Sequence, residues 1–311
     1  MKFHFNYVKN APIYFIITGV IVIIGIVSFV VRGFNWDIDF TGGTVMQYQL
    51  NTPMDSKDAQ DALSKLVSDL IGKTPEIQAA GNPPTQVIIK LPSIDTATRD
   101  SITNMLKENY SISDSDILSI DNITPVVGTQ LRNSALLAMG VAIVLMLIYI
   151  TIRFEFQSAL AAIIGLAFDV FVTITAYSLF HVPVNSTVIA SILTILGYSI
   201  NATVIVFDRV RETRRLYRNS DFSTCINSSV NHTLTRTINT TVTVLITSVA
   251  IMIFGVTQIR DFVFPMMFGF ASGVFTSTCL AGQLWNLFHN MGTKKPTTPV
   301  PAGKTPAAAS K

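Results

Sequence analysis

One acidic residue inside an apolar stretch is the clearest candidate for chemistry. Asp169 lies in the middle of Ala-Ile-Ile-Gly-Leu-Ala-Phe-Asp-Val-Phe-Val-Thr, part of a run long enough to cross a membrane. A charged carboxylate at the bilayer centre costs roughly 2.5–3.5 kcal/mol on insertion scales, so such residues normally face protein or water and serve a function. Burial favours the protonated carboxyl, and a nearby base favours the ionised form. We therefore predict that Asp169 carries protons, with a structural hydrogen bond between helices as the alternative.

Polar residues in two later apolar stretches could extend a proton path. Within 186–207, one helical face carries Ser191, Thr194, Tyr198 and Asn201, with Gly197 beside them. Within 238–258, Thr240, Thr243 and Thr247 share a face. We predict Asn201 and Thr243 as further members of a proton relay, and packing between helices is the alternative for both.

Charged and small residues near the apolar stretches have structural interpretations. Asp208 and Arg209 close one stretch and Arg236 precedes another, which is typical of the water interface. Gly269 and Gly273, four residues apart, permit a close helix crossing. The residues at helical spacing from Asp169 are also small and predict close contact with another helix: Ala161, Ala162, Gly165, Thr173 and Ala176.

A short motif follows the first apolar stretch. It contains Asp37, Asp39, Gly42 and Gly43, and the glycine pair allows backbone shapes closed to other residues. The pattern lacks the Gly-Lys-Ser/Thr of a phosphate-binding loop and the carboxylate spacing of a calcium loop. We predict a rigid joint between a membrane part and an outer domain.

Composition indicates a membrane protein. Of the 311 residues, 49% are hydrophobic and 13% are charged, against about 25% charged in soluble domains. Six apolar stretches, each close to the ~20 residues of a spanning helix, lie near 13–31, 134–152, 158–180, 186–207, 238–258 and 262–288. Basic residues such as Lys9, Arg153 and Arg209 gather on one side of these six helices, which the positive-inside rule makes the cytoplasm.

These patterns predict an α-helical polytopic membrane protein with one extracytoplasmic α+β domain between its first two helices. Strand and helix patterns near 44–50, 55–71, 75–80, 86–91, 95–110 and 115–123 give the order βαββαβ, a ferredoxin-like sandwich. The expected divisions are a cytoplasmic N-terminus (1–12), helix 13–31, the outer domain (32–133), five helices (134–290) with a basic cytoplasmic segment (208–236), and a disordered cytoplasmic tail (291–311). Both termini then lie in the cytoplasm.

Several segments together resemble the SecD/SecF family of protein export proteins. They are Phe34-Asn-Trp-Asp-Ile-Asp-Phe-Thr-Gly-Gly-Thr44, Gly197-Tyr-Ser-Ile-Asn-Ala-Thr through Glu212, Leu234-Thr-Arg-Thr-Ile-Asn-Thr-Thr, and Phe268-Gly269 through Ser277. Two positions depart from the family pattern. Ala202 stands where Asp is frequent, and Phe168 precedes Asp169 where His is frequent.

The resemblance implies a SecF-type subunit in the bacterial cytoplasmic membrane. Such a subunit pairs with SecD as a heterodimer related to exporters of the resistance–nodulation–division superfamily. The implied further partners are the SecYEG translocon, the translocating polypeptide, and YajC and YidC. The implied function is to use the proton-motive force to promote protein export, with the proton as coupling ion and Asp169 at the family's intramembrane Asp position.

Other function classes remain to be separated from this one. Half of a proton-driven exporter of small molecules or lipids would have the same helices, and a scaffold would need no proton chemistry. The net charge of +3 is too small to indicate nucleic-acid binding. The two cysteines and four histidines show no disulfide or metal-ligand spacing. We find no catalytic constellation, so we expect no enzyme activity, cofactor or metal.

Overall fold

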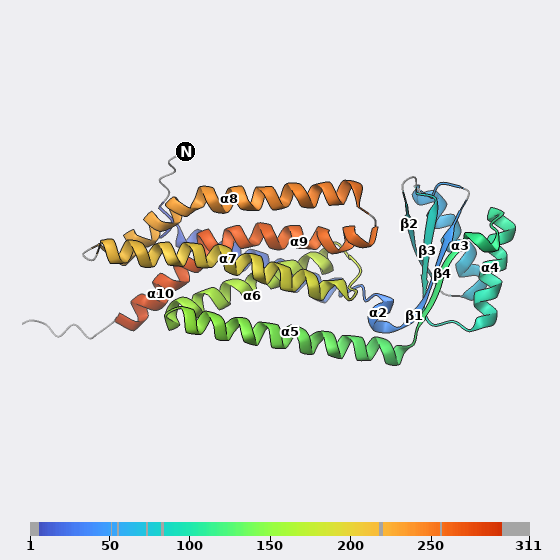
Figure 1. Ribbon diagram of the computed structural model, residues 1–311, viewed down its shortest axis with the longest axis horizontal. Coiled ribbons are helices and arrows are strands. Elements are labelled where there is room, and N and C mark those ends of the chain that lie inside the picture. The colour runs from blue at the N-terminus through green and yellow to red at the C-terminus, as the bar shows by residue number, and fades with distance from the viewer. Residues whose placement is uncertain are drawn as a thin grey trace, which may run out of the picture.

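A bundle of long helices carries a small α/β domain at one end (Figure 1). The computed structural model describes residues 6–50, 52–54, 56–72, 74–81, 84–217, 220–255 and 257–293. Within these residues, six helical spans are long and apolar enough to cross a membrane, as predicted. The first five are α1 (Ala11–Val31), α5 (Pro125–Arg153), α6 (Phe156–Leu179), α7 (Thr187–Leu216) and α8 (Phe222–Phe254). The sixth combines α9 (Thr257–Phe275), the π-helical segment η2 (Thr276–Leu280) and α10 (Ala281–Thr293).

The outer domain has the predicted βαββαβ order. After the short α2 (Ile38–Thr41) come β1 (Gly43–Gln49), α3 (Lys57–Ile71), β2 (Glu76–Ala80), β3 (Gln86–Leu91), α4 (Thr96–Tyr110), the 3-10 turn η1 (Asp114–Asp116) and β4 (Ile117–Ile123). The sheet order is β2-β3-β1-β4 with every neighbouring pair antiparallel. The helix–strand alternation and this order are those of a split βαβ sandwich.

Side-chain alternation gives the sheet two different faces. Val87, Ile89 and Leu91 of β3 are buried in the domain core with residues of α3 and α4. Because successive side chains of a strand point to opposite faces, Lys90 points away from that core. Figure 1 shows the helices α3 and α4 on the far side of the sheet, so the face with Lys90 is turned toward the bundle.

The membrane helices differ strongly in how much of their surface the chain itself covers. In their most apolar windows, 56% of α6 and 61% of the sixth span is buried, compared with 11% of α1 and 6% of α5. Lipid or a partner must cover the exposed apolar faces. The helix that contains Asp169 and the sixth span are therefore the two that the chain itself covers most.

Some boundaries differ from the prediction. α5 begins at Pro125, inside the segment 32–133 assigned to the outer domain. Most of the basic segment 208–236 continues α7 to Leu216 and α8 from Phe222. α8 has 33 residues, about 50 Å at 1.5 Å per residue, which exceeds the ~30 Å hydrocarbon core. α10 extends to Thr293, and the rest of the predicted tail lies outside the described residues.

Candidate functional site

The carboxyl group of Asp169 is fully enclosed by the protein. Asp169 lies in the middle of α6 and is 0% exposed. The small residues predicted to share its contact face are indeed buried: Ala161, Ala162, Gly165, Thr173 and Ala176. Their size lets α7 and the sixth span approach the α6 backbone closely.

Three hydroxyl groups donate hydrogen bonds to this carboxyl. Ser272 and Thr276 of the sixth span donate to Oδ1 at 2.6 Å each. Ser199 of α7 donates to Oδ2. We call Ser199, Ser272 and Thr276 the hydroxyl cage. The cage joins α6, α7 and the sixth span at one polar point inside the bundle.

Hydroxyl groups suit a carboxyl that changes its protonation state. Each can donate to an ionised carboxylate or rotate to accept from a protonated carboxyl. Within the part of the chain that the structure describes, all hydrogen bonds to the Asp169 carboxyl come from hydroxyl groups. No group of three His, Cys, Asp or Glu residues capable of holding a metal ion occurs in that part. The hydroxyl cage can therefore accommodate the Asp169 carboxyl with or without a bound proton.

The sixth span is irregular where it meets Asp169. Thr276 is the first residue of the π-helical segment η2. π-helical turns inside longer helices are rare and frequently occur at functional sites. A Cβ atom added at Gly165 of α6 would overlap the Thr276 methyl group. Glycine at 165 thus allows the Thr276 hydroxyl to reach the carboxyl.

A matched pair of glycine substitutions tests this close packing. A methyl group at Gly269 would overlap Ile195 and Thr173, whereas one at Gly273 would make ordinary contact with Ser199 at 3.5 Å. We expect Gly269→Ala to lower the free energy of unfolding by about 1–3 kcal/mol, the usual cost of overpacking, and Gly273→Ala to change it much less. Thermal unfolding of the purified chain in detergent measures both. Equal effects would contradict this account of the helix crossing.

The structure places the other predicted relay residues away from Asp169. Asn201 is exposed on α7, and its side chain makes no hydrogen bond within the described residues. Thr243 is exposed on α8 and donates to the Asn239 carbonyl oxygen at 2.9 Å. Neither contacts the hydroxyl cage in the isolated chain.

The predicted interface charges lie at one end of the bundle. Asp208 pairs with Arg153 at 3.5 Å, and Arg209 pairs with Glu212 at 2.7 Å. Arg236 is exposed on α8, and Gly197 is exposed on α7 with open space beside it. None of the three cage residues is among the site residues predicted from the sequence. The four-residue spacing of Ser272 and Thr276 was the available signal for two of them.

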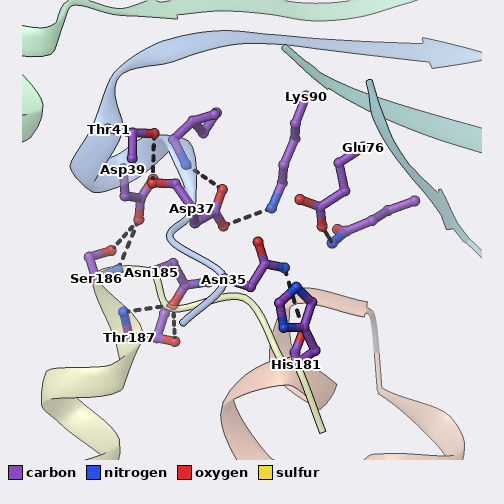
Figure 2. Close-up of polar contacts among 12 residues, drawn as sticks. Asn35, Asp37, Asp39, Thr41, Glu76, Lys90, His181, Asn185, Ser186 and Thr187 are labelled. Carbon is purple, nitrogen blue, oxygen red and sulfur yellow. Dashed lines mark hydrogen bonds and ion pairs between the residues drawn. The ribbon is translucent and has the colours of Figure 1, made fainter. Parts of the chain in front are cut away.

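A second polar cluster connects the outer domain to the bundle (Figure 2). We call residues 35–43 the joint. The backbone N–H of Asp37 donates to the carbonyl oxygen of Val184 at 3.1 Å. The backbone N–H of Val184 in turn donates to the carbonyl oxygen of Asn35 at 2.7 Å. Asp39 accepts hydrogen bonds from the backbone N–H and the hydroxyl of Ser186 at 3.0 and 2.7 Å. Ser186 precedes the first residue of α7, so the joint is fixed to the α6–α7 connection.

An ion pair fixes the same joint to the sheet. Lys90 Nζ lies 2.7 Å from Asp37 Oδ2, and the two side chains are 12% and 4% exposed. The other oxygen of Asp37 accepts the Ile38 N–H at 2.7 Å. Figure 2 shows Lys90 reaching from the sheet to the joint. Asp37 therefore links β3 to the segment bound to α7.

Both glycines of the joint meet a backbone requirement. Gly42 has a φ of +76°, a region that residues with a Cβ rarely adopt. A Cβ atom at Gly43 would overlap the Leu91 carbonyl oxygen. The pair lets the chain turn from α2 directly into the central strand β1.

Comparisons with known proteins agree on one family. The C-terminal family described as "Protein export membrane protein SecD/SecF" matches residues 101–291, and the SecD/SecF GG motif matches residues 27–54. The SecF translocase subunit of Acidaminococcus fermentans is 40% identical over 288 residues, covering 92% of this chain and 97% of that protein. The SecDF subunit of Bacillus subtilis is 32% identical over 298 residues, 93% of this chain and 39% of that protein.

A solved structure has the same fold. The crystal structure of SecDF from Thermus thermophilus, described as a translocon-associated membrane protein, superposes with a TM-score of 0.80 at 28% identity. The match covers 92% of this chain and 39% of the SecDF chain. The chain thus spans about two fifths of that larger protein.

Proposed function

This chain belongs to the SecD/SecF family of protein export membrane proteins, and we propose that it is the SecF subunit of a SecDF complex. In this proposal the complex associates with the SecYEG translocon and uses the proton-motive force to promote protein export. The proton is the coupling ion for export, and the chain itself acts as a transport subunit and catalyses no reaction.

The observation that supports proton coupling is the enclosed carboxyl of Asp169. It is the acidic residue at the meeting point of α6, α7 and the sixth span, and the hydroxyl cage accommodates both of its protonation states. Binding a proton removes a charge from the middle of the bundle and changes which hydroxyl groups donate. The relative packing of the three helices then depends on protonation.

An exposed polar strip supports the pairing with SecD. Thr194, Gly197 and Asn201 of α7 and Thr243 and Thr247 of α8 are exposed within the spans. A polar amide such as that of Asn201 is unfavourable against lipid, and small and polar residues are typical of interfaces between membrane helices. In our proposal a SecD helix covers this strip, and Asn201 and Thr243 enter the proton path only in the complex.

The charge distribution supports an orientation with both termini in the cytoplasm. Arg153, Asp208 and Arg209 lie at helix ends opposite the outer domain, and α10 ends on that side in Figure 1. The positive-inside rule assigns this end to the cytoplasm. The α/β domain then lies outside the cytoplasmic membrane, where exported polypeptide emerges.

The joint supplies a route from the proton site to the outer domain. α7 carries Ser199 of the hydroxyl cage, and its N-terminal end is bound to Asp39 of the joint. Asp37 of the joint is bound to Lys90 of the sheet. A change in packing at Asp169 would therefore move the outer domain through two polar contacts, Asp39 with Ser186 and Asp37 with Lys90.

Co-purification tests the assembly directly. We expect the tagged chain, expressed with SecD and the SecYEG channel, to recover SecD in equal amount and SecYEG in part. Asn201→Leu should reduce SecD recovery, and Val242→Leu, an exposed apolar position on α8, should leave it unchanged. If neither SecD nor SecYEG is recovered, the alternative of half a small-molecule or lipid exporter is favoured.

A further inference from the structure

An apolar cavity lies at the outer end of the bundle, apart from the proton site. Its volume is about 230 Å³, and only apolar atoms are exposed inside it. It is lined by Phe34, by the aromatic residues Trp36 and Phe40 of the joint, by Leu136 and Met139 of α5, and by residues of α6 and α7. Because cavities lined only by apolar atoms stay free of water, an apolar group is the expected occupant.

The packing of α5 leaves this cavity beside the lipid. The outer end of α5 lies tightly against α2, where a Cβ atom at Gly128 would touch the Phe40 carbonyl oxygen. Farther along, α5 is mostly uncovered, with Leu136 55% and Leu137 70% exposed. A lipid molecule next to α5 can therefore reach the space between α5 and the bundle.

A single cation lies at the edge of the cavity. Arg132 of α5 lines it one helical turn before Leu136 and is exposed. Arg132 forms neither an ion pair nor a hydrogen bond with any residue that the structure describes. The planar guanidinium group matches the geometry of a phosphate. An apolar cavity with an unpaired guanidinium at its outer edge is complementary to one end of a phospholipid.

We propose that this cavity binds an anionic phospholipid, with an acyl chain between α5 and α7 and the phosphate on Arg132. An anionic headgroup is preferred because it lacks the choline cation that a zwitterionic phosphatidylcholine would place beside the guanidinium group. An acyl chain fits a narrow apolar space, whereas an α-helix of a passing polypeptide, ~10–12 Å across with its side chains, does not. The lipid joins α5 to the aromatic residues of the joint at the membrane surface. This site requires neither the proton chemistry of Asp169 nor a SecD partner.

Quenching of tryptophan fluorescence by brominated lipids tests the site. The chain has two tryptophans, so Trp285→Phe leaves Trp36, which lines the cavity, as the only one. The full chain is reconstituted in phosphatidylcholine vesicles containing a minor fraction of brominated phosphatidylglycerol or brominated phosphatidylcholine. We expect the anionic lipid to quench Trp36 at about five-fold lower mole fraction, equivalent to about 1 kcal/mol for one basic residue. If Trp285→Phe does not fold, the difference between the native chain and Trp36→Phe gives the same signal.

Substitutions separate a binding site from the ordinary lipid surroundings. Arg132→Gln should abolish the preference, while Arg260→Gln should retain it, because Arg260 lies at the same outer end but donates to the Gly255 and Ile253 carbonyl oxygens. Ala135→Phe, which fills the cavity, should reduce quenching by both lipids. Equal quenching by the two lipids, or a preference that survives Arg132→Gln, would overturn the proposal. Displacement of both lipids by an extended apolar peptide, regardless of residue 132, would instead identify a peptide site.

Discussion

Asp169→Asn is expected to abolish the stimulation of protein export by the proton-motive force while leaving assembly with SecD intact. Asparagine keeps the size of the side chain, and its carbonyl oxygen can still accept from Ser272 and Thr276, which donate to one oxygen of Asp169. It cannot bind and release a proton at neutral pH. The measurement is translocation of a preprotein into membrane vesicles that contain the variant complex, with and without an imposed proton gradient.

A second acidic residue provides the control for this experiment. Asp208 is half-exposed at the end of the bundle and pairs with Arg153 at 3.5 Å. Exposed ion pairs contribute little, typically 0–1 kcal/mol, so Asp208→Asn should retain most of the stimulation. Undiminished stimulation in Asp169→Asn would remove this residue from the proton path and favour a scaffold.

The energy available to the site is sufficient for a conformational change. One elementary charge that crosses 100 mV releases about 2.3 kcal/mol. Since 1.4 kcal/mol is a factor of ten in an equilibrium constant, this shifts a two-state equilibrium by about fifty-fold. That shift is large enough to convert one packing of α6, α7 and the sixth span into another as the dominant state.

The second large effect is expected at the joint. Asp37→Asn preserves an oxygen for the Ile38 N–H but removes the partner charge of Lys90, which is only 12% exposed. Breaking a buried ion pair on one side typically costs 3–5 kcal/mol. Glu76 lies opposite Lys90 on β2 and offers partial compensation, so we expect a loss of about 3 kcal/mol, the low end of that range. Hydrogen exchange of β1 amides in the full chain should then be more than a hundred-fold faster.

Two further variants test whether the faster exchange comes from the unpaired charge of Lys90. The double variant Asp37→Asn with Lys90→Met removes both charges and should recover much of the protection. Asp114→Asn breaks the exposed pair with Lys107 and should have little effect. If Asp37→Asn is as mild as Asp114→Asn, the joint is not fixed to the sheet by this ion pair.

The sequence contained most of the fold but only part of the site. Apolar runs and period-two alternation located six spans and the βαββαβ domain, because both patterns are determined by which side of an element is buried. Asp169 was identifiable because a carboxylate in an apolar helix is costly. Ser199, Ser272 and Thr276 were not, because serine and threonine are common in membrane helices and their contacts depend on the rotation of each helix.

Helix rotation also explains why Asn201 lies away from the hydroxyl cage. Ser199 and Asn201 are two residues apart on α7, so about 200° of helical rotation separates them and they face different neighbours. Spacing alone indicated a shared polar face but not the direction of that face. The π-helical segment at Thr276 adds to the difficulty, since it changes the rotation of every residue after it in the sixth span.

Asp39 is attached to Ser186, the residue before α7, so the length of α7 amplifies small changes in its tilt. Ser199 lies thirteen residues after Ser186, which corresponds to about 20 Å of helix. A tilt of about 10° around Ser199 therefore moves the attached end sideways by about 3.5 Å. A tilt this small need not break the hydrogen bonds around the Asp169 carboxyl. At the membrane surface, however, it displaces the attached joint by about the spacing between neighbouring residues of a strand.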